Sequence, residues 1–451
     1  MLFSSFEFLF RFLPFFLVIY YLTPKKFRNV TLLGGSIVFY TIGEAGYITI
    51  LLACVLVNYT LTRLMYRKNT DGRGIRQKRL LLLALGYDLG VLFFFKYSGL
   101  ASGLPLGISF YTFQIMAYVI DVYRGRIPAE QSLLRLGTYL TMFPQLISGP
   151  ITNYADVRVA LGRERTIKAR QLEEGMKLLI IGLAAKVVIA DRIGTLWNSI
   201  RMIGFDSIST KLAWMGAFAY SLQLYFDFAG YSMMARGIGK MLGFELPVNF
   251  RYPYISKSVT EFWRRWHITL GRWFREYVYI PLGGNRKGKA RTFFNLFVVW
   301  SLTALWHGAN YNFLIWGGIL LCCLLVEKLF LLRLLDKSRV IGHLYVLFVV
   351  PLSWVAFAVT DLSELGVYMT RLFPFAGHAA GVINHLDYLK YLNDYAPLFL
   401  LGVLFATPLP ETCYRLIERR WIGRVILLGI FGLCMYYLAV SANNPFLYFN
   451  F

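Results

Sequence analysis

The sequence predicts an all-α protein that crosses a membrane many times, and three observations lead to this fold class. Hydrophobic residues make up 57% of the 451 residues and charged residues only 16%, whereas soluble domains carry about 45–50% apolar and about 25% charged residues. The mean hydropathy is +0.54, and apolar runs recur along the whole chain. A bilayer is the simplest solvent for so much apolar surface.

The apolar runs define the expected helices. A spanning helix needs about 20 mostly apolar residues, and runs of about 10–14 indicate buried or re-entrant segments. Long runs predict spans near 8–22, 30–66 (two helices broken around Gly43–Gly46), 80–95, 174–190, 211–230, 311–330, 341–359, 394–407 and 423–441. Shorter runs near 107–121, 134–148 and 293–306 predict partly inserted helices. We therefore expect roughly eleven membrane helices in a single membrane domain, residues 1–451.

The placement of the basic residues indicates that the net charge of +23 reflects membrane topology rather than nucleic-acid binding. They stand in short clusters between apolar runs, as around Lys25–Arg28 and Arg286–Arg291, which the positive-inside rule places on the cytoplasmic side. The polar stretch Asn153–Gln171 reads as a cytoplasmic loop. The cluster that follows the first apolar run puts the N-terminus outside. The five cysteines lack metal-ligand spacing, so we expect neither a disulfide framework nor a zinc or other metal site.

Two of the five histidines occur in settings that favour chemistry. His267 lies in the aromatic and basic segment Glu261–Tyr277. On a continuous helix, Trp263, Trp266 and His267 share one face with Leu270, Trp273, Phe274 and Tyr277, and the arginines take the opposite face. Such a helix is expected at the membrane interface, with His267 pointing away from the arginines. A structural histidine bonded to backbone is the alternative interpretation.

His307 lies in an apolar run from Phe293 to Val326 that is too long for one span. As one helix it would reach about 50 Å, against a hydrocarbon core of about 30 Å. The chain should therefore bend at His307–Asn310, where Gly308 and Asn310 tolerate a bend. An imidazole there could act as general base toward a hydroxyl, because its ordinary pKa lies near working pH. A histidine that merely caps the helix break is the alternative.

Other ionisable residues are expected at membrane depth. They are Asp88, Asp121, Lys186 and Asp227. Such groups need partners, and for Asp227 an arginine or a tyrosine hydroxyl is the ordinary solution. We expect Asp227 to be structural rather than catalytic.

A set of motifs runs along nearly the whole chain and is densest from Tyr225 to Gly318. The motifs are Tyr225–Phe228, Asn249–Tyr254, Phe262–His267, Tyr279–Arg286 and Leu305–Gly308, with further ones at Gly107–Gln114, Phe143–Pro150 and Asn444–Phe451. In these motifs the chain resembles the membrane-bound O-acyltransferases, in particular the bacterial alginate O-acetyltransferase branch. One departure is Gly230-Tyr-Ser-Met-Met234, where the alginate branch usually has an acidic residue after the serine and the teichoic acid D-alanyl branch a hydrophobic one.

The resemblance implies a funnel of helices, some re-entrant or interfacial, in the bacterial cytoplasmic (inner) membrane. It implies that His307 is catalytic and His267 its second histidine, and we expect substrate contacts from Trp306, Asn310, Arg264, Arg265, Tyr225 and Asp227. It also implies acetyl-CoA as donor with no bound cofactor, an extracytoplasmic polysaccharide as acceptor, and a partner enzyme of the SGNH hydrolase type. D-alanyl transfer to teichoic acid, a transporter and a non-enzymatic scaffold are the competing functions.

Overall fold

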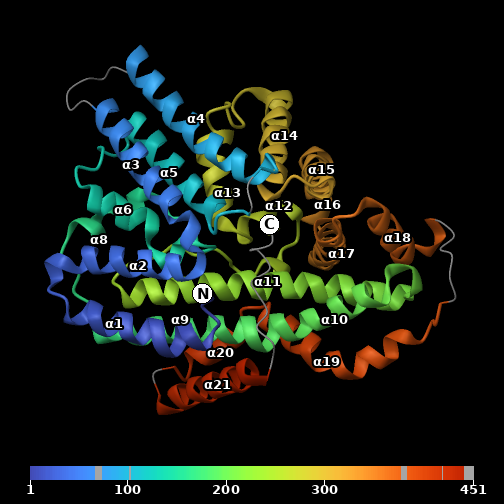
Figure 1. The fold of residues 1–451 in the computed structure, drawn as a ribbon. Coiled ribbons are helices and arrows are strands. Elements are labelled where there is room, and N and C mark those ends of the chain that lie inside the picture. The colour runs from blue at the N-terminus through green and yellow to red at the C-terminus, as the bar shows by residue number, and fades with distance from the viewer. Residues whose placement is uncertain (67–73, 101–102, 377–382, 419, 441–451) are drawn as a thin grey trace. The chain divides into compact units, whose positions relative to one another are not determined.

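The computed structural model describes residues 1–66, 74–100, 103–376, 383–418 and 420–440 (Figure 1). These residues form helices joined by turns, with no strand among them, which confirms the all-α class. The chain divides into two compact units. Unit 1 comprises Met1–Ile180, Tyr231–Val248 and Arg272–Tyr277, and unit 2 comprises Ile181–Gly230, Asn249–Gly271 and Val278–Phe451. The C-terminal motif Asn444–Phe451 and His378 lie outside the described residues.

Unit 1 is built from the N-terminal helices. They are α1 (Leu13–Leu22), α2 (Arg28–Glu44), α3 (Ile48–Met65), α4 (Ile75–Tyr97), α5 (Ile108–Tyr123), α6 (Leu133–Thr141), α7 (Phe143–Leu146), α8 (Tyr154–Gly162) and most of α9 (Ala169–Ala184). Helix α3 packs against α4, and α4 against α5. The break expected around Gly43–Gly46 is confirmed, since α2 ends at Glu44 and a single 3₁₀ turn separates it from α3.

Unit 2 holds the remaining helices. After the π-helical turn η4 (Ala185–Ala190) come α10 (Asp191–Ile203), the greater part of α11 (Thr210–Met241), α12 (Val259–Arg265), the start of α13 (Ile268–Phe274), α14 (Gly288–His307), α15 (Tyr311–Val326), α16 (Leu332–Leu335), α17 (Arg339–Ala358), α18 (Leu362–Leu372), α19 (Asp387–Phe405), α20 (Leu409–Arg415) and α21 (Trp421–Val440). Helix α14 packs against α15, and α15 against α17. The short helix α12 contacts both α15 and α17, which brings the segment before His267 close to the helices around His307.

Five helical segments in the described residues are long and apolar enough to cross a membrane, and a sixth results if the bent pair α19–α20 counts as one span. They are Lys25–Met65, Ile75–Tyr97, Tyr311–Leu335, Arg339–Ala358 and Trp421–Val440. The expected number of about eleven is therefore not confirmed. The stretch near 107–121, predicted as a partly inserted helix, is α5, and nearly every side chain of α5 is buried, so this helix is apolar because it lies inside protein.

Two of the long apolar helices, α4 and α21, expose most of their apolar side chains. Only 11% of the apolar window of α21 is buried, and 17% of that of α4. Leu83 and Leu428 are 61% and 67% exposed. Soluble monomers rarely expose contiguous apolar surface of this extent, so these faces require lipid.

The polar stretch after Asn153 differs from the expected loop. Its first part is helix α8, which begins with a capping box: the Asn153 side chain accepts from the third residue of the helix, and Asp156 accepts from the Asn153 backbone N–H. A reciprocal cap satisfies two backbone donors that would otherwise be unpaired. The cap explains why a helix starts in a polar segment.

Candidate active site

His267 lies in a break between two short helices. The predicted continuous helix from Glu261 to Tyr277 is wrong, because α12 ends at Arg265 and α13 begins at Ile268. His267 has a backbone φ of 43°, a left-handed conformation uncommon for residues other than glycine. Two backbone hydrogen bonds hold the break against the preceding segment: the Ile268 N–H donates to the Asn249 carbonyl at 2.9 Å, and the Arg251 N–H to the Arg265 carbonyl at 3.0 Å.

The predicted burial pattern around this histidine is nevertheless correct. The aromatic and apolar residues Trp266, Leu270, Trp273, Phe274 and Tyr277 are buried, and Trp263 is half-buried. Arg264 and Arg275 are exposed. His267 itself is only 2% exposed. The helical spacing thus predicted correctly which side chains are buried. The break between α12 and α13 changes only the backbone that carries them.

Asn249 is the polar partner of His267, and we did not identify it from the sequence. Its Oδ1 atom lies 3.1 Å from the Nδ1 atom of His267. The same oxygen accepts from the Thr269 hydroxyl at 2.9 Å and from the Thr269 backbone N–H at 3.3 Å. Asn249 opens one of the motifs that carry the family resemblance, so the signal was present, but no local spacing assigned it to His267.

His307 is the last residue of α14, and the predicted bend after it is confirmed. Helix α15 begins at Tyr311, and Gly308 has extended backbone rather than a left-handed conformation. Gly308 is needed for close packing, since a Cβ atom at that position would lie 2.4 Å from the Phe313 ring. Asn310 is exposed immediately before α15.

Aromatic rings surround the His307 imidazole. The ring of Trp316 lies 5.0 Å from it between centroids and that of Phe357 at 5.1 Å, both edge to face. The ring centroid of Trp306 lies 4.9 Å from that of His307 and 6.3 Å from that of His267. Phe228 on α11 packs edge to face on His267 at 4.8 Å. The structure therefore brings His267, Trp306 and His307 together around one indole.

Asp227 is buried in an ion pair, which agrees with a structural role. Its Oδ1 atom lies 2.7 Å from the Lys186 ammonium, which also contacts Asp191 at 2.6 Å. The partner is thus a lysine rather than the expected arginine or tyrosine. A buried carboxylate needs such a partner because desolvation disfavours an isolated charge.

The remaining predicted substrate contacts are dispersed. Tyr225 is buried among Tyr254, Phe250 and Trp266. Arg265 forms an ion pair with Glu261 at 2.8 Å, whereas Arg264 makes no ion pair with a residue that the structure describes. Of these two arginines, Arg264 is the one whose charge is available to an anion.

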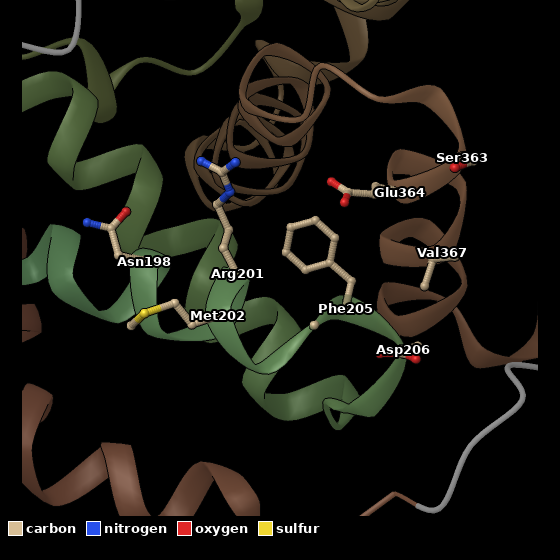
Figure 2. A pocket seen from close by; sticks show the side chains of 9 residues that line it. Asn198, Arg201, Met202, Phe205, Asp206, Ser363, Glu364 and Val367 are labelled. Carbon is tan, nitrogen blue, oxygen red and sulfur yellow. The ribbon is translucent and has the colours of Figure 1, made fainter.

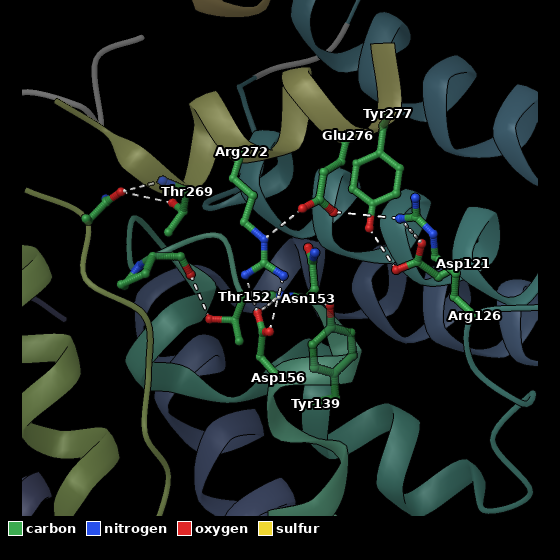
Figure 3. A network of polar contacts seen from close by, with 12 residues as sticks. Asp121, Arg126, Tyr139, Thr152, Asn153, Asp156, Thr269, Arg272, Glu276 and Tyr277 are labelled. Carbon is green, nitrogen blue, oxygen red and sulfur yellow. Dashed lines mark hydrogen bonds and ion pairs between the residues drawn. The ribbon is translucent and has the colours of Figure 1, made fainter. Parts of the chain in front are cut away.

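Arg272, the next arginine along the chain after Arg265, lies in a polar network of unit 1 (Figure 3). Arg272 forms a two-pronged ion pair with Asp156, at 3.0 and 3.3 Å, and a further one with Glu276 at 3.3 Å. Glu276 also lies 3.8 Å from Arg126, which contacts Asp121 at 3.2 Å. Three carboxylates thus neutralise two guanidinium groups. Arg272 is paired within the protein and is therefore a poor candidate for binding an anionic acyl donor.

Neither of two cavities in the described residues is lined by a histidine. One, of about 640 Å³, lies in unit 2 between α10, the turn after it and α18, and the side chains of Arg201, Phe205 and Glu364 project toward it (Figure 2). The other, of about 510 Å³, lies in unit 1 beside Glu130 and Arg135. No predicted site residue lines either cavity. The described residues contain no group of three His, Cys, Asp or Glu side chains that could hold a metal ion.

Burial keeps the imidazole of His267 neutral. It lowers the pKa of His267 to about 3 from its ordinary 6.5, because desolvation disfavours the charged form. Helices α12 and α13 have seven residues each, too few to span a bilayer. A pKa this far below neutral pH makes His267 a weak proton acceptor, which leaves His307 as the better candidate for a general base.

An all-helical chain with outward apolar faces and two buried imidazoles at helix breaks defines a membrane enzyme. The model of the membrane-bound O-acyltransferase family (MBOAT) matches residues 37–339. The chain belongs to this family, and it is a multi-pass membrane protein and an O-acyltransferase.

Curated relatives cover the chain to different extents. The probable alginate O-acetylase AlgI of Pseudomonas putida is 35% identical over 100% of both chains. The peptidoglycan O-acetyltransferase of Helicobacter pylori is 29% identical over 100% of this chain and 98% of its own. The teichoic acid D-alanyltransferase of Bacillus subtilis is 32% identical over 48% of this chain and 58% of its own.

Proposed function

We propose that this protein transfers an acetyl group from acetyl-CoA toward a hydroxyl of an extracytoplasmic polysaccharide. The observation that carries the proposal is that two buried imidazoles, His307 and His267, both contact the indole of Trp306 in a chain of this family. Relatives whose names state O-acetylation of a polysaccharide align over the entire chain, which favours acetyl as the acyl group.

In the proposed reaction His307 is the general base. It takes the proton from the acceptor hydroxyl as that oxygen attacks the thioester carbonyl carbon. The C–S bond breaks, and the proton on the imidazole passes to the departing thiolate, which leaves as the free thiol. General base catalysis contributes about 10²–10⁴-fold. His267, which also contacts Trp306, assists His307, and the exposed Arg264 attracts the anionic donor.

The proposal extends to the setting of the enzyme. We place it in the bacterial inner membrane, with the N-terminus outside and one membrane domain over residues 1–451. The acceptor of the acetyl group is either the polysaccharide itself or an extracytoplasmic partner of the SGNH hydrolase type, which then completes the transfer. We propose that Trp306 and Asn310 contact the substrate, because Trp306 precedes His307 at the end of α14 and Asn310 comes directly before α15.

D-alanyl transfer to teichoic acid is the second candidate. One observation favours it: Met233 follows Gly230-Tyr-Ser232 in this chain, where the acetyl branch usually has an acidic residue. The D-alanyltransferase relative aligns over only about half of each chain, so we rank this function below acetyl transfer.

The test is release of labelled acetyl from acetyl-CoA by purified protein in detergent, wild type against His307→Ala. Turnover that disappears in the variant while the gel-filtration profile is unchanged supports the acetyltransferase and the role of His307 together. Equal turnover in both proteins would remove His307 from the mechanism, as expected for a transporter or scaffold. Turnover with a D-alanyl carrier but not with acetyl-CoA would select the second candidate.

A further inference from the structure

We propose that Asn249 is a positioning residue for His267: its amide oxygen holds the imidazole in the tautomer that carries the proton on Nδ1, so that Nε2 presents the lone pair. The role in turnover rests on the proposed acyl transfer. The tautomer itself is a property of the folded protein and can be measured without any reaction.

The contacts of Thr269 fix the orientation of the Asn249 amide. A backbone N–H can only donate, and the Thr269 N–H points at the Asn249 side-chain atom assigned as Oδ1, at 3.3 Å. The Thr269 hydroxyl reaches the same atom at 2.9 Å. A flipped amide would place an NH₂ group against this N–H, donor against donor. The atom that faces His267 is therefore the oxygen.

An amide oxygen in turn fixes the imidazole. Oδ1 can only accept, so Nδ1 of His267, 3.1 Å away, must be the donor. In a neutral imidazole with the proton on Nδ1, the lone pair is on Nε2. Asn249 is 1% exposed and His267 2%, so bulk water does not compete for this hydrogen bond.

The same asparagine also fixes the backbone that carries the ring. Its carbonyl accepts from the N–H of Ile268, the residue after His267, at 2.9 Å. The left-handed conformation of His267 is thus held from one side by Asn249 and from the other by the start of α13. One residue therefore sets both the place of the imidazole and its proton.

The charges around His267 are consistent with a neutral partner. From α11 it meets Phe228, while the adjacent Asp227 is paired with Lys186 at 2.7 Å. From α14 it meets Trp306, with the titratable His307 next to it. A carboxylate in place of the Asn249 amide would stabilise the imidazolium. An amide orients the ring and leaves it neutral, as a resting base requires.

The experiment measures tautomer and turnover in matched variants of the full chain. Protein labelled with ¹⁵N-histidine, in detergent, reports which ring nitrogen carries the proton, and the His267→Asn variant identifies the resonance. We expect Nδ1–H in the wild type and loss of that preference in Asn249→Ala. Thr269→Val loses the hydroxyl but keeps the backbone N–H that orients the Asn249 amide, so as the control it should retain Nδ1–H. Asn249→Asp should retain Nδ1–H.

Turnover supplies the second readout. Asn249→Ala should lower kcat about 10–100-fold, the scale of a misplaced catalytic group, with the KM for acetyl-CoA within about twofold. Asn249→Asp should restore most of kcat and move the acid limb of the pH–rate profile upward, which a merely structural asparagine would not do.

Each outcome decides the inference. A wild-type His267 protonated on Nε2, or an Asn249→Ala variant that keeps Nδ1–H, overturns it, as does a changed tautomer with unchanged kcat. If Asn249→Ala does not fold, the tautomer in the wild type and in Asn249→Asp still tests it. Wild-type protein with the expected tautomer but no acetyl turnover would refute the proposed function and leave the orientation of His267 established.

Discussion

Two helix breaks in unit 2 carry the candidate catalytic histidines, and they are built from different interactions. His267 is held by a hydrogen bond to the Asn249 side chain and by backbone pairing next to its own left-handed conformation. His307 ends a long helix and is enclosed by the rings of Trp306, Trp316 and Phe357. Hydrogen bonds select a tautomer, whereas edge-to-face ring contacts fix the plane of an imidazole without selecting its proton. This difference leads us to propose separate tasks for the two histidines.

The largest effect is expected from removing either imidazole. His307→Ala should lower acetyl turnover about 10²–10⁴-fold, the contribution of a general base. His267→Asn, which tolerates the left-handed backbone, should cost less. The measurement is single-turnover chemistry in detergent, with gel filtration as the folding control. Equal losses in the two variants would break the proposed division of tasks.

Trp306 links the two breaks, so its replacement should affect both histidines. Trp306→Ala should destabilise the protein by about 3–5 kcal/mol, the usual cost of removing a buried Trp or Phe ring, and should lower kcat more than the stability loss explains. Trp306→Phe is the matched control, because it keeps an aromatic ring. Thermal unfolding and turnover measured on the same preparations separate the two effects. An alanine variant with normal kcat would show that the indole only fills space.

The third prediction concerns the close approach at the His307 break. Gly308→Ala places a Cβ atom 2.4 Å from the Phe313 ring, and overpacking of this kind costs about 1–3 kcal/mol. The control is Gly318→Ala on α15, where a Cβ atom would meet nothing within 4 Å. We expect a lower Tm for the first variant and an unchanged Tm for the second. A Phe313→Leu second change should restore Tm in the first variant, and its failure to do so would refute the packing explanation.

The fourth prediction uses the pKa of His267. Its folded value of about 3 lies below the ordinary 6.5, so below pH 6.5 the unfolded chain binds a proton that the folded chain does not. Stability should therefore fall as pH decreases from about 6.5, by up to about 1.4 kcal/mol per pH unit. His267→Asn should remove most of this pH dependence. Asn249→Asp should reduce the loss of stability as the pH falls. The check is Tm against pH for the three proteins.

The smallest effects are expected at the two arginines before the His267 break. Arg265→Gln loses a partly exposed pair with Glu261, worth about 0–1 kcal/mol. Arg264→Gln should leave Tm unchanged and raise the KM for acetyl-CoA about two- to fivefold, more at low salt than at high salt. Measuring the KM for acetyl-CoA at two ionic strengths distinguishes the two variants. Equal KM changes in both variants would indicate a general charge effect rather than a donor contact at Arg264.

Part of the fold and site could be predicted because it follows from composition and length. The apolar runs located the long helices, including the interruption near Gly43 and the bend after His307, where a single helix would have exceeded the bilayer. The spacing of aromatic residues also predicted which side chains around His267 are buried. Each of these properties depends on residues that are close in sequence.

What the sequence alone determined about this protein is an all-helical membrane chain of the acyltransferase family with two histidines worth testing. The tertiary structure decided how they are used. It ended a helix at His267 through backbone pairing with residues 249–251, brought both imidazoles into contact with Trp306, and gave Asp227 a lysine partner from η4. These long-range contacts join segments 14 to 41 residues apart, and their energies depend on desolvation and hydrogen-bond geometry that no local pattern encodes.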